Sequence, residues 1–333
     1  GGSILNAIGG SIINAIQQFI QETLHISNYS FFCRKEFDAR PYERLADYDG
    51  EYLQFETSLN YKDLLKLNKT IKHNSYVVDQ CISLAEHAMD LVRYVHSSFL
   101  RKEFTPNPAG QMEDGFYTVN IIPIEYTHLK SFELSGISRP FSISNNWLGP
   151  QVDHFYAEGI DYLSTIYSGD IENDMTAHIV SALRSCRQSF YALGSESQFL
   201  NLIFTLDGLT EADGTGWRHR TYLAALLCNK CPNRFEKVLK RYDELYCDVR
   251  NKLVHEGKDF YQINEEPEQA CEEIYNYIKD IIKLVSHELF SDTPSMKAYA
   301  ESLLKRQDFK DKYIKVINAA SLDRGKNYQI PVW

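Results

Sequence analysis

Residues 232–257, PNRFEKVLKRYDELYCDVRNKLVHEG, are the stretch from which the fold and the function of this chain are best inferred. Pro232 suits the first turn of a helix, where its missing N–H has no partner to lose. Apolar residues then recur at intervals of three and four, the spacing of one face of an amphipathic helix: Phe235, Val238, Leu239, Tyr242, Leu245, Tyr246, Val249 and Leu253. Gly257 favours the left-handed conformation that ends a helix, so we expect His255 in the last turn.

Similar patterns surround this helix. Amphipathic spacing predicts further helices over residues 170–191, 195–209, 217–229 and 267–289. Ser195 and Gln198 have the spacing of a capping box at the start of the second of these. The connections between the segments are short, which favours antiparallel packing of neighbouring helices in a bundle over residues 153–320.

The N-terminal part of the chain has a different composition. Runs of aromatic and β-branched residues predict strands over 51–59, 116–124 and 130–136, and a helical stripe covers 75–100. We therefore expect an α+β fold, mainly α, with a mixed α/β region of unknown role over residues 27–150. Residues 1–26 repeat an octad, GGSILNAI then GGSIINAI, without an initiator Met. They are interpreted as an apolar oligomerisation helix or an artificial extension.

Composition limits the class of protein. The chain has 333 residues, of which 44% are hydrophobic and 24% charged, as in globular proteins. Seven irregularly spaced cysteines indicate reduced thiols and a cytoplasmic location, with no membrane partner. We find no phosphate-binding loop, dinucleotide fingerprint or metalloprotease motif. Cys228 and Cys231 have metal-ligand spacing without a second pair, so neither a metal nor a cofactor is expected.

The end of the helix over 232–257 carries three groups with complementary chemistry. The Arg250 guanidinium can hold a phosphate through two hydrogen bonds, and the His255 imidazole can move a proton near neutral pH. The Asn251 amide, four residues before His255, shares its helix face. Without a carboxylate cluster for a metal, this set suits attack by an RNA 2′-hydroxyl on its own phosphodiester. The alternative is structural, because cations at a helix C-terminus also offset its dipole.

The motif resembles the signature of HEPN domains, in which Arg is followed after four to six residues by His. A polar residue often follows the Arg directly, as Asn251 follows Arg250 here. The runs 246–257 (YCDVRNKLVHEG) and 198–209 (QFLNLIFTLDGL) are most similar to the Apea-like branch. The resemblance covers roughly residues 155–310, under half of the chain.

That resemblance implies a metal-independent endoribonuclease that leaves a 2′,3′-cyclic phosphate and a 5′-hydroxyl. His255 would shuttle protons, Arg250 would stabilise the phosphate charge and Asn251 would position it. Such proteins are often toxins or anti-phage abortive-infection effectors that cut tRNA or other RNA. They commonly form homodimers or higher homo-oligomers and can have an antitoxin or sensor partner. Asp207 stands where the family pattern leads us to expect a Glu, which puts a supporting role for this carboxylate in doubt.

Charge also favours an RNA partner. The chain carries a net charge of −10, yet residues 218–258 hold ten basic and five acidic residues, a local net of +5. We therefore take Lys252, Arg218 and Arg220 as candidate RNA contacts, although a charged helix start is often simply solvated. Two other functions stay open: a HEPN-like module that binds RNA, nucleotide or protein without catalysis, and a non-enzymatic assembly subunit.

Overall fold

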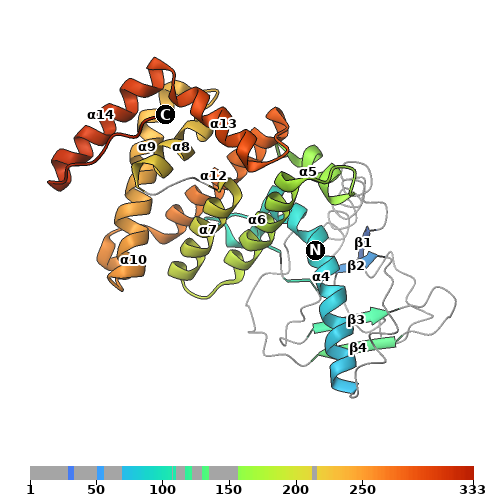
Figure 1. Cartoon of the computed structure of the whole chain (residues 1–333). Helices are drawn as coiled ribbons and strands as arrows, with labels where there is room; N and C mark the ends of the chain where they lie inside the picture. The colour runs from blue at the N-terminus through green and yellow to red at the C-terminus, as the bar shows by residue number, and fades with distance from the viewer. Residues whose placement is uncertain are drawn as a thin grey trace, which may run out of the picture. The chain divides into compact units, whose positions relative to one another are not determined.

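The computed structural model describes residues 29–33, 51–55, 70–106, 108–109, 117–121, 130–134, 157–211 and 216–333. The chain divides into two compact units, Gly1–Asp170 and Ile171–Trp333 (Figure 1). The second unit therefore begins later than the residue 153 expected from the sequence. The helix expected within residues 1–26 lies outside the described residues.

The described part of the first unit is mainly helical. It contains α4 (Thr70–His96), the short 3-10 helix η2 (Lys102–Phe104) and α5 (Ile160–Tyr167). Strand β1 (Tyr29–Cys33) pairs antiparallel with β2 (Glu51–Phe55), and β3 (Tyr117–Ile121) pairs antiparallel with β4 (Lys130–Leu134). Tyr94 of α4 donates a hydrogen bond to the carbonyl of Glu158, which anchors α4 to the turn before α5.

The α+β class expected from the sequence is wrong, because the described residues are mostly helical. Each short strand has a single partner, and no sheet of three or more strands occurs among the described residues. Aromatic and β-branched runs favour extended backbone locally, but two isolated strand pairs do not make the sheet layer that defines an α+β fold. The mixed α/β region expected over 27–150 is not supported either, since the long helix α4 dominates its described part.

The second unit is built from helices, some of which begin at a side-chain cap. Its elements in chain order are α6 (Asp174–Tyr191), α7 (Ser195–Thr210), α8 (Trp217–Leu227), η3 (Pro232–Arg234), α9 (Phe235–Asp243), η4 (Glu244–Arg250), α10 (Asn251–His255), α11 (Phe260–Ile263), α12 (Pro267–Glu288), α13 (Thr293–Leu304) and α14 (Gln307–Arg324). Asn173 caps α6 in a reciprocal capping box with Thr176, and Asp292 caps α13. The capping box expected at Ser195 does not form, because Gly194 occupies the cap position and Gln198 bonds the carbonyl of Ala192 instead.

Two groups of helices share the core of this unit (Figure 1). In one group α7 packs against α6 and α12, and in the other α8 packs against α9 and α13 while α14 covers α9. Phe235 and Phe309 meet edge to face at 4.8 Å in the second group. The fully buried Ile and Leu residues of α7, α8 and α12 join the two groups through the contact of α12 with both.

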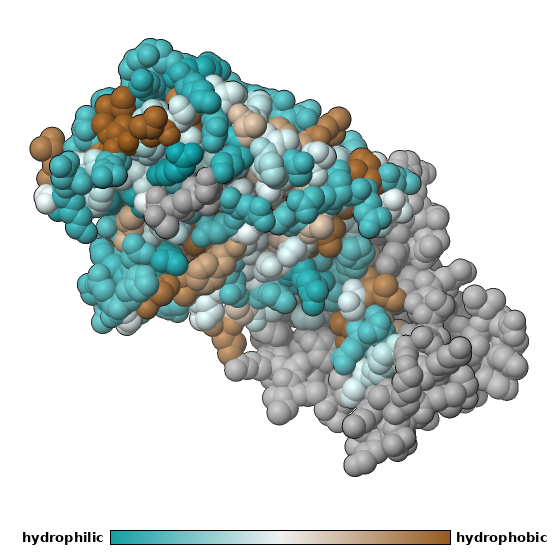
Figure 2. Space-filling model, in the orientation of Figure 1, coloured by the Kyte–Doolittle hydropathy of each residue, from teal (hydrophilic) through white to brown (hydrophobic). Residues whose placement is uncertain are grey.

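The surface of the second unit is mostly polar. Figure 2 shows hydrophilic residues over most of its visible face, with hydrophobic ones in several small patches. Large apolar side chains that reach the surface include Phe204, Val254 and Tyr261. None of the described helices is both long enough and apolar enough to cross a membrane.

Candidate functional site

The motif lies where the sequence places it, at the end of α10. Asn251 and His255 are the first and last residues of this short helix, and Gly257 follows with a φ of +63°. The expected left-handed helix end at Gly257 is therefore confirmed. The His255 side chain is exposed, and it has no hydrogen-bond or ion-pair partner among the described residues. It is accessible to a bound molecule.

Arg250 is held by a polar and an aromatic contact. Its Nη1 donates a hydrogen bond to Oδ1 of Asn251 over 2.9 Å. Its guanidinium carbon lies 5.3 Å from the ring centre of Tyr246 and 5.8 Å from that of Phe204. Its Nε is buried without a hydrogen-bond partner in the part of the chain that the structure describes. These contacts fix the head group and leave donors available for an anion.

The segment that carries Arg250 is a π-helix, which the sequence pattern did not predict. Residues Glu244–Arg250 form this wider turn between α9 and α10, so the single helix expected over 232–255 has four parts, η3, α9, η4 and α10. A π-helical turn shifts the side chains that follow it relative to a regular helix. The wider turn ends at Arg250 and Asn251–His255 is α-helical, so it does not alter the angle of about 140° between Arg250 and His255 that regular helical spacing implies.

Behind Arg250 a buried polar network links α7, α8 and α9. Nε2 of His219 lies 3.1 Å from Oδ1 of Asp207, and the Tyr242 hydroxyl lies 3.5 Å from the same nitrogen. The Tyr246 ring stands edge-on to His219 at 4.9 Å and joins this network to Arg250. Burial, together with the Asp207 charge, raises the pKa of Tyr246, so its phenol stays neutral beside Arg250. Asp207 is thus a partly buried partner of His219 rather than a free surface carboxylate.

A second charged network lies beside the π-helix. Asp243 is almost fully buried and binds Nε of Arg220 at 2.9 Å and Nη1 of Arg324 at 2.8 Å. Arg324 also pairs with Asp248, and Arg220 donates to Sγ of Cys247 over 2.8 Å. Burial outweighs the two guanidinium groups and raises the pKa of Asp243. This network fixes α8 and α14 to the helix that carries the motif.

The residues expected to bind RNA lie in three different environments. Lys252 is partly exposed on α10, next to Asn251. Arg218 stacks on Trp333 at 4.3 Å and donates to the carbonyl of Val332, so it holds the C-terminal segment against α8. Arg220 is 4% exposed and bound to Asp243, which makes it a core residue. Of these three residues, Lys252 lies beside the motif, whereas Arg218 and Arg220 contact other parts of the unit.

Part of the basic charge counted over 218–258 is neutralised by ion pairs, because Arg218, Arg220, Arg241 and Lys258 each contact a carboxylate. Arg241 alone contacts three carboxylates, those of Glu244, Glu265 and Glu273. Two of these come from outside the counted segment. Arg250 differs, because no described carboxylate lies within ion-pair distance of it. Within the described residues Arg250 therefore keeps its positive charge unpaired, as do the exposed Lys237 and Lys240 of α9.

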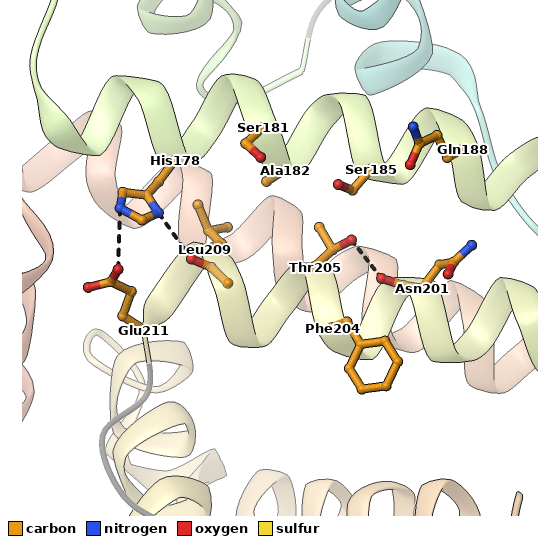
Figure 3. Close-up of a pocket in the computed structure, with 11 residues that line it drawn as sticks. His178, Ser181, Ala182, Ser185, Gln188, Asn201, Phe204, Thr205, Leu209 and Glu211 are labelled. Carbon is orange, nitrogen blue, oxygen red and sulfur yellow. Dashed lines mark hydrogen bonds and ion pairs between the residues drawn. The ribbon is translucent and has the colours of Figure 1, made fainter. Parts of the chain in front are cut away.

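A groove of about 450 Å³ runs between α6 and α7 (Figure 3). Ser181, Ser185 and Gln188 line it from α6, and Asn201, Phe204 and Thr205 line it from α7. His178 closes one end, with Nδ1 at 3.1 Å from the carbonyl of Gly208 and Nε2 at 3.6 Å from Glu211. Phe204 belongs both to this groove and to the surroundings of Arg250, so groove and motif are neighbours. No sequence pattern predicts the groove, since serines and amides on helices are ordinary surface residues.

No group of three or more His, Cys, Asp or Glu side chains suited to a metal ion occurs in the described ranges. Cys228 is buried in the core while Cys231 is exposed. The two thiols therefore lie in different environments despite their close spacing.

Comparisons with protein-family models, with curated proteins and with solved structures gave no match to this chain. The candidate function therefore depends on the chemistry of the site.

Proposed function

We propose that this chain is a metal-independent endoribonuclease of HEPN type with an Apea-like domain over roughly residues 155–310. Its proposed biological role is that of a cytoplasmic toxin or anti-phage abortive-infection effector that cuts RNA. The observation that carries the proposal is the arrangement at α10: Arg250 is bound to Asn251, and His255 is exposed at the end of the same helix.

The three side chains have separate tasks in the proposed reaction. His255 accepts the proton of the RNA 2′-hydroxyl, whose oxygen attacks the adjacent phosphorus. The bond from phosphorus to the 5′-oxygen breaks, and that oxygen takes a proton from a protonated His255 imidazole, which leaves a 2′,3′-cyclic phosphate and a 5′-hydroxyl. Arg250 stabilises the charge on the phosphoryl oxygens.

Asn251 contributes through its amide orientation. Its Oδ1 already accepts from Arg250, so both N–H bonds of the amide remain for a phosphate oxygen. The Asp207–His219–Tyr246 contacts fix the aromatic surface under Arg250 and thereby set the direction of the guanidinium. Lys252 adds a positive charge for the RNA backbone.

A second candidate is a HEPN-like module that binds RNA, nucleotide or protein without cutting. The exposure of His255 favours it, because no described group orients the imidazole within one chain. In the nuclease proposal, the group that orients the imidazole comes from a second copy of the motif in a homodimer.

The test is cleavage of labelled single-stranded RNA and tRNA by the full chain in the presence of EDTA. Wild type should cut with the chelator present and should not cut an RNA with 2′-deoxyribose at the cleavage position. His255→Ala and Arg250→Ala should each reduce the rate by at least about a hundredfold, because each removes a group from the reacting centre.

Thermal melting of the same variants serves as the control. His255 is exposed at a helix end, so its variant should melt within a few degrees of wild type, whereas Arg250→Ala also loses its contacts with Tyr246 and Phe204 and should melt at a lower temperature while remaining folded. Undiminished cutting by either variant, or equal cutting of DNA, would contradict the nuclease proposal. RNA binding without cutting by the wild type would favour the second candidate.

A further inference from the structure

The groove between α6 and α7 is lined by neutral polar groups. Ser181, Ser185, Gln188 and Asn201 have no side-chain hydrogen-bond partner within the described residues, so their donors and acceptors are free for a ligand. The volume of about 450 Å³ falls in the range of small-molecule sites, roughly 300–1,000 Å³. The groove is therefore large enough and polar enough to recognise a small heterocycle.

One large aromatic ring stands at its edge. Phe204 is 49% exposed, although it lies in the middle of the otherwise well-buried helix α7. Phe204 lines the groove, and Figure 3 shows its ring projecting from the side of α7 that faces away from α6. An exposed ring next to free amides and hydroxyls is the combination that binds unpaired nucleic-acid bases, by stacking and by hydrogen bonds to the base edge.

We infer that this groove binds an unpaired base of the RNA next to the scissile phosphate, an inference that rests on the proposed nuclease function. Phe204 connects the two sites, since its ring lines the groove and lies 5.8 Å from the guanidinium carbon of Arg250. A phosphate on Arg250 would place the neighbouring base at Phe204, with Asn201 and Gln188 beside its edge.

The charge of the lining favours a base over a phosphate in the groove itself. Its charged or titratable groups are His178 and Glu211, and both lie at the far end, where they contact each other. Glu211 also accepts a hydrogen bond from Thr293. The middle of the groove offers amide and hydroxyl groups, which match the neutral donors and acceptors of a nucleobase.

The experiment compares RNAs that differ only in the nucleotides flanking the mapped cut, with A, G, C, U or an abasic residue at each position. Wild type should prefer one base and should show the highest KM for the abasic RNA. Asn201→Ala and Gln188→Ala should raise KM for the preferred base about tenfold, toward the abasic value, with kcat unchanged.

Two substitutions of Phe204 are compared, because Arg250 lies over its ring and one substitution alone would also change this contact. Phe204→Leu should raise KM about tenfold through lost stacking, and Phe204→Trp should retain the wild-type value. Asn318→Ala removes an exposed amide on α14, away from the groove residues, and is the matched control that should change nothing.

The outcomes separate the two proposals. Cleavage without base preference, or groove variants that act equally on abasic RNA, would overturn the base site and leave the nuclease intact. If no RNA is cut, binding of the four nucleoside 5′-monophosphates is measured by calorimetry. Binding that Asn201→Ala weakens would support the groove without the nuclease, and no binding of any of the four would overturn it.

Discussion

Asp243 shows how one carboxylate holds the motif helix in place. It is buried between Arg220 of α8 and Arg324 of α14, and both contacts are shorter than 3 Å. Burial raises the pKa of Asp243, which means that the ionised carboxylate is costly to bury even between two cations. Removing it is costlier still, because the Arg220 charge would remain buried without a negatively charged partner.

We therefore expect Asp243→Asn to lower the free energy of unfolding by about 3 kcal/mol. Asp248→Asn is the matched control, since Asp248 pairs with the same Arg324 but its side chain is 43% exposed. The control should change stability by less than about 1 kcal/mol. Urea unfolding followed by circular dichroism measures both, and equal effects of the two variants would contradict the assigned role of Asp243.

Single residues of the site were only partly predictable. Gly257 and His255 follow from local helix-end chemistry, and the structure places both as expected. Arg220 and His219 look like a solvated helix start in sequence, yet both are buried, because their partners Asp243 and Asp207 come from other helices. Pairings between distant segments leave no periodic signal in the sequence.

The junction of α8, α9 and α14 contains a buried thiol whose pKa is strongly raised. Cys228 ends α8 and lies in a core cluster with Phe235 and Phe309. Burial raises the pKa of this thiol from 9.0 to about 12. Because the folded pKa is the higher one, the stabilisation is complete below pH 9 and is lost as the pH rises toward 12.

Cys228→Ala should reduce this loss of stability at high pH. Between pH 8 and pH 10.5 the free energy of unfolding should fall by about 2 kcal/mol more for wild type than for the variant. This value follows because each pH unit above 9 costs about 1.36 kcal/mol. The exposed Cys231 provides the control variant Cys231→Ala, which should follow wild type. Urea unfolding at the two pH values tests the difference, and identical slopes for all three proteins would contradict it.

Helices were the predictable elements and their irregularities were not. Periodicity identified α7, α8 and α12 within a few residues, although α8 is buried on nearly all sides rather than along one apolar face. The π-helix at Glu244–Arg250 leaves the apolar spacing almost unchanged, so the sequence predicted a regular helix there. Strand propensity was misleading for the fold class, because local preference does not supply further strands to pair with.

For the whole molecule, the exposed apolar residues near the motif favour self-association. Val254 is next to His255 on α10, and Tyr261 on α11 is almost fully exposed. A twofold contact through these residues would bring two His255 side chains together, one for each proton transfer of the proposed reaction.

The full chain should therefore run as a dimer or larger assembly in light scattering at assay concentration. Mixing inactive Arg250→Ala and His255→Ala proteins should restore part of the cleavage, because a mixed dimer contains one intact copy of each group. Tyr261→Ala should weaken both the assembly and the activity. A fully active monomer would contradict the shared site.

The docking of the C-terminal segment on α8 has a spectroscopic consequence. Two of the three tryptophans take part in it: Trp217 contacts Tyr328, and Trp333 lies under Arg218. Arg220 also stacks on Trp217 and bonds Cys247 of the π-helix. Tryptophan fluorescence therefore reports whether the C-terminal segment is bound to α8. A change in this fluorescence during an RNA titration would indicate that ligand binding at α10 is transmitted through Arg220 to Trp217 and the C-terminal segment.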